Sequence, residues 1–444
     1  MTSTSDSATE AVRPSQALGK GVFWHRSFIG MLLTQFLGVF NDNLFKQIVL
    51  FVCVAAGSDS AQGTATIAFS IPFILLSGFC GFLADRFSKQ RIVILSKVLE
   101  IVVMLMGMAA FASGNLKFLF LVLFLMGAQS AFFGPSKYGI FPELFHDDDL
   151  PKVNGVIQMT MFIAIILGFA LSGVVKEWAG DEHLYRASYV CIAIAIVGTL
   201  TSLILPRTPV AHPGLEFVPS NFFVNSETRR EILGDRKLLL ALLATSAFWS
   251  AGGLVYPPAI NDLGLLQLNL SESQTGFLAA STGLGIAVGC IVGMLLSHDK
   301  FNGKLVQLGS FGMLLGLIAV GLPGGANGAN VIGVSGSAIA LIWIGLCAGI
   351  FNVPLAAYIQ AKAPTAHKGR VIAAMNLMNW IGIYMSGVFY KIAVPIQQAN
   401  NLPPCTLFLA AGMILAPVAL FYRPGSETLC SDNPLELVPA KGPI

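Results

Sequence analysis

Charged residues are scarce in this chain of 444 residues, where they make up only 11% of the sequence. A soluble protein carries about a quarter charged residues. Hydrophobic residues reach 55%, and the mean hydropathy is +0.74. This composition excludes an ordinary soluble protein and indicates an integral membrane protein with many spans. The formal net charge of +3 is small and its basic residues are spread over many loops, so nucleic acid is not expected as a partner.

The sequence also lacks the motifs of common enzyme classes. It contains no phosphate-binding G-x-x-x-x-G-K-[ST] loop, no G-x-S-x-G elbow and no H-E-x-x-H pair. The seven cysteines include no C-x-x-C pattern, and most lie inside apolar runs, where a free thiol behaves as a small hydrophobe. The sequence therefore predicts a protein that is not an enzyme and that uses neither a cofactor nor a metal ion.

A cleavable signal peptide is missing as well. The first 27 residues are polar and lack an apolar core that ends in a small-residue cleavage site. We therefore expect the first apolar run to direct insertion into the membrane.

Twelve apolar runs follow one another along the chain, six on each side of a longer polar stretch. They lie at about 28–56, 65–83, 92–111, 116–133, 156–175, 188–205, 238–260, 274–296, 305–322, 331–358, 371–396 and 405–421. Most are long enough to cross a bilayer as a helix. The expected fold is an all-α membrane protein with twelve transmembrane helices in two six-helix halves. Its expected parts are an N-terminal tail (1–27), a first half (28–205), a central loop (206–236), a second half (237–423) and a C-terminal tail (424–444).

The distribution of Lys and Arg predicts the orientation. If the N-terminus is cytoplasmic, only Lys117, Lys176, Arg186 and Lys391 fall on the opposite side, and Lys46 lies within the membrane. The remaining 21 of the 26 basic residues are then cytoplasmic. Because cytoplasmic loops carry the excess of basic residues, we expect both termini and the central loop in the cytoplasm.

The two halves resemble each other in sequence. Gly81–Arg91 follows the second run, and a similar loop at Gly293–Lys304 follows the eighth run, 212 residues later. The same offset places the polar triplet 41–43 over 253–255, next to Tyr256. Homologous six-helix halves around a central loop are the repeat organisation of a secondary transporter.

Polar residues interrupt the middle of the first run. Asn41, Asp42, Asn43 and Lys46 lie near the centre of 28–56. A charge there costs about 2.5–3.5 kcal/mol on insertion scales, so these side chains should face the bundle interior and form a substrate site. Asp42 and Lys46 are four residues apart and can pair on one helix face. The alternative is therefore a closed ion pair that only orients the helix. We favour a functional site, because an apolar pair would avoid the desolvation cost.

The loop after the second run carries a second polar motif. Gly81, Asp85, Arg86 and Arg91 fit a G-x-x-x-D-R-x-x-[KR]-x-[KR] pattern, which resembles the cytoplasmic signature of the major facilitator superfamily. Gly81 would allow close helix approach, and Asp85 would accept bonds across the bundle and hold the cytoplasmic side shut. The alternative is that the basic residues only anchor the topology. The two roles are compatible, and we expect these residues to form a gate.

Further candidates lie in other spans. Gly134 and Pro135 should stop or kink the fourth helix, which would place Lys137 near the membrane interface as a headgroup contact or as a snorkelling side chain. We expect Gly134 and Pro135 to belong to the gate as well. The membrane centre of the second half appears uncharged, and Tyr256 and Asn379 are the polar candidates there. Glycines also recur every four residues in the eighth run, at Gly285, Gly289 and Gly293, which predicts a close-packing helix face.

Together these segments resemble one transporter family. The similarity is carried by Gln35–Lys46 (QFLGVFNDNLFK), Ala84–Lys89 (ADRFSK), Gly134–Leu144 (GPSKYGIFPEL) and Leu150–Gly155 (LPKVNG). They resemble the lysophospholipid transporter family, a bacterial branch of the major facilitator superfamily. The match covers most of the first half and is looser in the second.

The resemblance implies a function and a partner. Members of the family are expected to flip lysophospholipids from the outer to the inner leaflet of the bacterial inner membrane, where an acyltransferase/acyl-carrier-protein synthetase re-acylates them. It further implies that Asp42 and Lys137 contact or gate around the headgroup.

Two other functions stay open from the sequence. One is a proton-coupled transporter of small amphipathic molecules with Asp42 as the protonatable carboxylate. The other is a non-transporting membrane partner that docks an acyltransferase.

Overall fold

The structure is a computed structural model that describes residues 24–57, 60–145, 150–210, 214, 226–297, 300–324, 330–362 and 368–428. Most of the tails expected at 1–27 and 424–444, part of the central loop, and His298 and Asp299 of the repeated loop lie outside the described residues.

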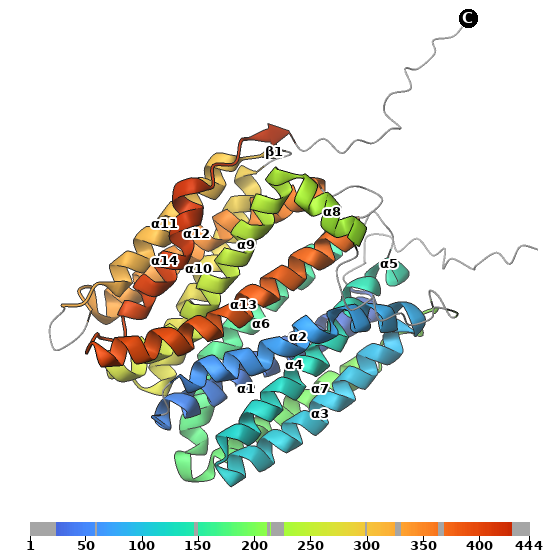
Figure 1. Cartoon of the computed structure of the whole chain (residues 1–444). Coiled ribbons are helices and arrows are strands. Elements are labelled where there is room, and N and C mark those ends of the chain that lie inside the picture. Colours follow the sequence, from blue (N-terminus) through green and yellow to red (C-terminus); the bar gives the residue numbers. More distant parts are fainter. Residues whose placement is uncertain are drawn as a thin grey trace, which may run out of the picture.

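Long helices make up almost all of the described chain (Figure 1). The first half contains α1 (Arg26–Ala55), α2 (Ala61–Arg86), α3 (Lys89–Ser113), α4 (Leu116–Gly139), the short α5 (Phe141–Leu144), α6 (Leu150–Ala179), the 3-10 helix η3 (Asp181–Arg186) and α7 (Ala187–Ser202). The short helix α8 (Ser226–Gly234) precedes the second half. That half contains α9 (Arg236–Leu254), the π-helical turns η5 (Val255–Ala259) and η6 (Asp262–Gln267), α10 (Glu272–Leu296), α11 (Gly303–Gly321), α12 (Gly333–Lys362), α13 (Lys368–Ala399) and α14 (Thr406–Phe421). The two-residue strands β1 (Lys300–Phe301) and β2 (Glu427–Thr428) pair antiparallel.

The expected twelve-span fold is confirmed. Eleven helical segments of the described chain are long and apolar enough to cross a membrane, and the 16-residue α14 is a shorter twelfth. Because successive spans alternate in direction, α1 begins and α14 ends at the same end of the bundle. We call this the inner end and the opposite one the outer end.

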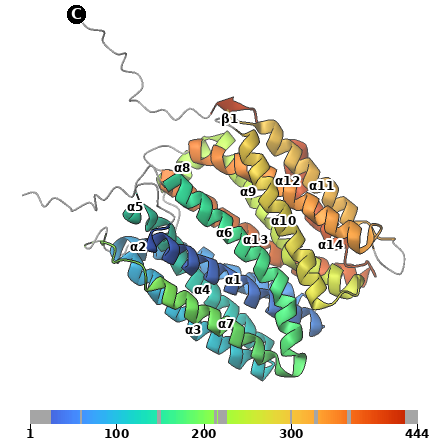
Figure 2. The same ribbon diagram turned by 180° about the vertical axis from the view of Figure 1, so that it is seen from behind.

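The two halves have separate hydrophobic cores. One core is formed by α1–α4, α6 and α7, and the other by α9–α14, with Phe169 of α6 joining the second. The halves meet along two helix pairs, α2 with α13 (Figure 1) and α6 with α10 (Figure 2). Any substrate path between the halves therefore runs past these four helices.

Local sequence signals set the helix ends. Asn115 caps α4 by accepting from two backbone N–H groups, and Asp235 does the same for α9. Ser271 and Gln274 form a capping box at the start of α10. These caps lie at the ends of apolar runs, and most expected spans agree with the helices to within a few residues, the fourth, fifth and seventh being longer than expected.

The expected glycine face of α10 is confirmed. A side chain on Gly285 or Gly289 would meet the backbone of Ile342 or Leu346 in α12. These glycines allow the two helices to pack backbone to backbone, as small residues do between membrane helices.

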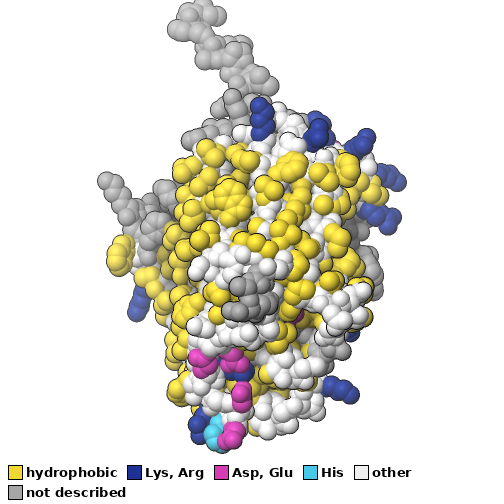
Figure 3. Space-filling model, turned by 90° about the vertical axis from the view of Figure 1, so that its left-hand side faces the viewer, with side chains coloured by type: hydrophobic (Ala, Val, Ile, Leu, Met, Phe, Trp, Pro, Cys, Tyr) yellow, Lys and Arg dark blue, Asp and Glu magenta, His cyan; other side chains and the backbone are white. Residues whose placement is uncertain are grey.

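The surface fits an integral membrane protein. Figure 3 shows hydrophobic side chains over most of one face, with basic side chains gathered at its top and acidic ones near its bottom. Exposed large apolar residues occur on both halves, among them Leu105, Leu171, Leu284 and Leu315. Such a surface is compatible with lipid rather than with water.

Candidate functional site

The polar residues of α1 do not form the ion pair that the sequence allows. The Oδ2 atom of Asp42 accepts a hydrogen bond from the Ser130 hydroxyl of α4 at 2.6 Å, and its Oδ1 atom is buried with no hydrogen-bond partner among the described residues. Asp42 and Lys46 form no salt bridge in the described chain. The closed-pair alternative is therefore wrong for this structure, and both groups keep bonding capacity for another molecule.

Lys46 lies over aromatic rings. Its ammonium group is 5.0 Å from the ring centroid of Phe69 in α2 and 5.6 Å from that of Phe169 in α6. Two ring faces stabilise a desolvated cation by about 1–2 kcal/mol each, but they do not neutralise it. Lys46 therefore offers a positive charge near the meeting point of the two halves.

The aromatic rings continue into the second half. Tyr256 contacts Phe169 at 4.6 Å between ring centroids, and Trp380 of α13 stacks on Phe73 of α2 at 3.6 Å. The Tyr256 hydroxyl and the Oδ1 atom of Asn379 are buried without a hydrogen-bond partner in the described chain. Both predicted candidates of the second half thus carry unsatisfied polar atoms, which a polar ligand would satisfy.

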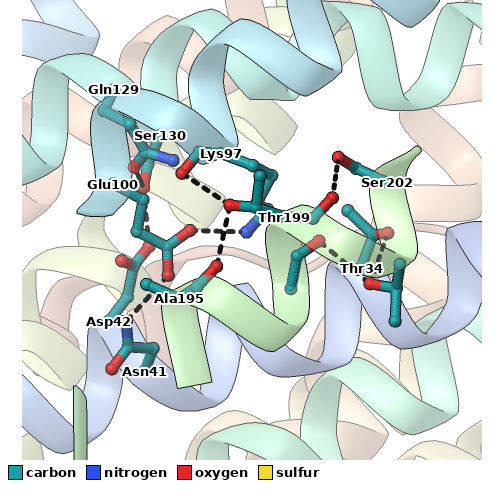
Figure 4. A network of polar contacts seen from close by, with 12 residues as sticks. Thr34, Asn41, Asp42, Lys97, Glu100, Gln129, Ser130, Ala195, Thr199 and Ser202 are labelled. Atoms are coloured by element: carbon teal, nitrogen blue, oxygen red, sulfur yellow. Dashed lines mark hydrogen bonds and ion pairs between the residues drawn. The ribbon is translucent and has the colours of Figure 1, made fainter. Parts of the chain in front are cut away.

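A charged pair that the sequence analysis did not predict lies in α3 and contacts Asn41. Lys97 and Glu100 of α3 are 2.6 Å apart and each is about 1% exposed. The other Glu100 oxygen accepts from the Asn41 amide at 2.8 Å, as Figure 4 shows. The charge count had placed Lys97 on the cytoplasmic side, which is wrong. Its spacing of three from Glu100 inside an apolar run was the signal for a buried helical pair.

Asn41 and Asn43 have different surroundings although both belong to the predicted site. Asn41 is fully buried and holds Glu100. The Asn43 amide instead donates to the Val39 carbonyl one turn earlier at 2.7 Å. Asn41 is thus part of the charged network, whereas Asn43 is satisfied by its own helix.

Lys137 is buried at the inner end of α4. The helix runs through Gly134 and Pro135 to Gly139, so Gly-Pro does not stop it, whereas the kink and the gating role of these two residues stay predictions. Nearby at the same end, Lys89 of α3 forms an ion pair with Glu143 of α5. The headgroup role of Lys137 stays a prediction.

The predicted gate residues are exposed in this structure. Asp85, Arg86 and Arg91 lie at the inner end, and Arg86 is stacked near the rings of Phe82 and Phe87. Within the described chain no hydrogen bond or ion pair of Asp85 crosses the bundle. A side chain on Gly81 would meet no atom within 4 Å, so the expected close helix packing there is wrong. The gating role itself stays a prediction.

The second half is not uncharged inside. The seventh apolar run was expected to end at Ile260, but the helical span continues to Gln267 through η5 and η6. Asp262 is therefore enclosed and is about 5% exposed. Tyr256, with φ −114° and ψ 104°, breaks the regular helix just before it. The seventh apolar run contains two prolines, and its sequence gave no indication that the helix would continue after them.

Comparison with known proteins identifies the family. The model of the Major Facilitator Superfamily matches residues 22–387. The chain belongs to this superfamily. It is 29% identical over 383 residues to the "Lysophospholipid transporter LplT" of Enterobacter sp. (strain 638), covering 84% of this chain and 89% of the relative. The relative of the same name from Serratia proteamaculans (strain 568) is 27% identical over 378 residues, with the same coverage.

Solved structures agree with the superfamily fold. A crystal structure of a mutant of the nucleoside transporter NupG has a TM-score of 0.70 at 13% identity, covering 88% of this chain and 98% of that one. A POT family transporter in complex with 5-aminolevulinic acid has a TM-score of 0.68 at 15% identity, covering 90% and 97%. This superfamily member is a secondary transporter and not an enzyme.

Proposed function

We propose that this superfamily member carries lysophospholipid from the outer to the inner leaflet of the bacterial inner membrane. It does so by alternating access of its two halves. The observation that carries the proposal is the state of Asp42 and Lys46. These opposite charges lie one helical turn apart in the membrane interior, and they form no ion pair with each other. A zwitterionic headgroup supplies a complementary partner to each.

The two groups match the headgroup of lysophosphatidylethanolamine. Its phosphate would bind the Lys46 ammonium, and its amine would bind the free Oδ1 atom of Asp42. The unsatisfied Tyr256 hydroxyl and Asn379 Oδ1 supply further polar contacts from the second half. Desolvating a headgroup costs several kcal/mol, and these bonds would offset that cost.

The similarity to relatives named lysophospholipid transporter supports this cargo. The distribution of Lys and Arg supports a cytoplasmic inner end with both termini on that side. Lysophospholipid delivered to the inner leaflet would then meet the proposed partner, an acyltransferase/acyl-carrier-protein synthetase. Asp85, Arg86, Arg91 and Lys137 would control access from the inner end.

The test compares lysophosphatidylethanolamine with lysophosphatidic acid, which has the phosphate but no amine. Uptake of each is measured in spheroplasts with the wild-type protein and with Asp42→Asn. We expect the substitution to reduce lysophosphatidylethanolamine uptake at least about tenfold, the effect of one lost charge-assisted bond. Lysophosphatidic acid uptake should change less, because it places no cation at Asp42.

Protein amount and folding are checked by fluorescence-detected gel filtration. No uptake of either lipid by folded wild-type protein would exclude lysophospholipid as the cargo. Equal loss of both lipids in Asp42→Asn would contradict the assignment of Asp42 to the amine. Lipid uptake that stops when an ionophore collapses the proton gradient at constant outer pH would favour the proton-coupled alternative.

A further inference from the structure

A second buried polar cluster lies toward the outer end, directly beyond the proposed headgroup site. It contains five side chains from four segments of both halves: Gln47 of α1, Gln62 of α2, Asn261 and Asp262 of the broken seventh span, and Tyr390 of α13. All five are buried. We call these five residues the outer seal, because each hydrogen bond among them either joins the two halves or supports a bond that joins them.

The hydrogen bonds of the outer seal run in one direction. The Gln47 amide donates to the Asn261 Oδ1 at 2.7 Å, and the Asn261 amide donates to the Gln62 Oε1 at 2.8 Å. The Gln62 amide then donates to the Asp262 Oδ1 at 2.8 Å. The Tyr390 hydroxyl accepts from Gln62 at 2.8 Å and donates to the Asp262 Oδ2 at 2.6 Å. The chain therefore ends at both carboxylate oxygens of Asp262.

This direction requires Asp262 to be ionised. A carboxylate accepts hydrogen bonds on both oxygens, whereas a protonated carboxyl must donate from one of them. Gln62 cannot accept through its amide nitrogen, and Tyr390 would have to turn its hydroxyl hydrogen away from Asp262. Protonation of Oδ1 would remove the bond from Gln62, and protonation of Oδ2 would reverse the bond with Tyr390 and leave the Tyr390 hydroxyl hydrogen without this acceptor. Either change weakens a chain in which each bond polarises the next.

No basic residue neutralises Asp262 in the described chain. The salt bridges there do not include it. The other titratable groups near it are Tyr390 and, beyond Tyr390, Cys53 of α1. Lys391 of α13 is exposed, and its side-chain stem lies beside Gly63 of α2. Only these hydrogen bonds stabilise the negative charge of Asp262, so binding of one proton to this carboxylate would disturb the whole hydrogen-bonded chain.

A second polar contact closes the same end. Lys176 of α6 forms ion pairs with Asp181 of η3 at 2.8 Å and with Glu272 of α10. Glu177 accepts from the backbone N–H of Ser273 at 2.8 Å and from its hydroxyl at 2.6 Å. The outer ends of α6 and α10 are therefore tied as well, and opening this end requires both contacts to separate.

We propose that Asp262 is a proton-binding gate residue, and that protonation from the outer side releases the outer seal and opens the path between the halves. Gln47 follows Lys46 directly in α1, so the gate and the proposed headgroup site share one helical turn. Substrate entry from the outer side would then be faster when that side is acidic.

The test measures the distance between the halves at the outer end and needs no substrate. Spin labels are placed at the exposed Ala56 and Gln398, in a background whose other cysteines are replaced by alanine. Distance distributions of the purified protein are recorded at about pH 8 and at about pH 5. This range lies above the ordinary titration range of carboxyl groups, so exposed Asp and Glu side chains stay mostly ionised across it. We expect the share of the longer distance to rise about threefold at the lower pH, a shift of less than 1 kcal/mol between the two states.

Variants assign the pH response to Asp262. Asp262→Asn cannot ionise and should show the longer distance at both pH values. Tyr390→Phe removes one donor, so it should widen the distance at about pH 8 and still respond to pH. Glu177→Gln weakens only the second contact and should keep the wild-type pH response.

A pH-independent distance in the wild type would overturn the proposal, and so would a wild-type response in Asp262→Asn. If Asp262→Asn does not fold, the wild type and Tyr390→Phe still decide the question. Because no lipid is present, a failure here is separate from a failure of the proposed lysophospholipid transport.

Discussion

Lys46 of α1 and Lys97 of α3 both lie within spans of the first half, and their surroundings differ. Lys97 is paired at 2.6 Å with Glu100, and that carboxylate also holds Asn41. Lys46 has two aromatic rings and no carboxylate partner in the described chain. A buried pair already satisfies its own charges, whereas an unpaired charge retains its attraction for a ligand. On this comparison we propose a structural role for Lys97 and a substrate-binding role for Lys46.

The largest effect is expected from breaking the paired lysine. Glu100→Ala leaves Lys97 as a buried charge without a partner, which costs about 3–5 kcal/mol. It also removes the acceptor of Asn41. We expect a strongly lowered unfolding temperature of the purified protein, measured by thermal denaturation in detergent.

A double variant is the matched control. Lys97→Met with Glu100→Leu removes both charges and should recover most of the lost stability, because buried pairs can often be replaced by apolar residues. If Glu100→Ala melts at the wild-type temperature, the pair does not stabilise the bundle and the comparison fails.

The next largest effect is expected from the unpaired lysine, and it concerns transport. Lys46→Gln removes the charge but leaves a side chain of similar length between the two rings. We expect the unfolding temperature to change little. Lysophosphatidylethanolamine uptake should fall at least about tenfold, the equivalent of about 1.4 kcal/mol of headgroup binding. Uptake in spheroplasts and thermal denaturation of the same protein preparation measure the two effects.

Lys46→Arg provides the control for charge. It keeps the cation and the ring contacts, so it should retain more uptake than Lys46→Gln. A large loss of stability with either substitution would show that Lys46 is structural, like Lys97.

The sequence predicted the fold and the charged stretch of α1 because both depend on local composition. Apolar runs longer than about 18 residues have few alternatives to membrane-spanning helices. Asp42 and Lys46 stood out because charge in such a run is costly. The partners of these groups were not predictable, since Ser130 and Phe169 lie in other helices far along the chain.

The errors have physical reasons too. Lys97 was assigned to the cytoplasm because the count of Lys and Arg grouped it with the loop that precedes α3. The count did not consider that Glu100, three residues later, could pair with it inside the span. Asp262 was left outside the seventh span because the apolar run ends at Ile260, just before two polar residues, whereas π-helical turns carry the chain onward to Gln267. Gly81 matches a sequence motif, but the space beside it in this structure is open. A motif indicates a family; it does not by itself give the contact.

The smallest effect on uptake is expected from a substitution of Asn43. This prediction tests which polar residues of α1 belong to the proposed substrate site. The Asn43 amide is satisfied by the Val39 carbonyl of its own helix, and its Cβ atom lies near Gly168 of α6. Asn43→Ala keeps that packing atom and removes only the local bond, which is worth about 0.5–1.5 kcal/mol at most. We expect uptake to change by less than about twofold, because the lost hydrogen bond is weak and lies within α1.

Asn41→Ala is the matched comparison, because Asn41 is the neighbouring asparagine and binds Glu100. It should lower stability more than Asn43→Ala does, since a buried carboxylate oxygen loses its donor. If Asn43→Ala instead abolishes uptake of a folded protein, Asn43 must turn from Val39 to the substrate during transport. The four polar residues Asn41, Asp42, Asn43 and Lys46 of α1 would then act together during transport. Roles inferred from the contacts in this structure would hold only for the charged residues.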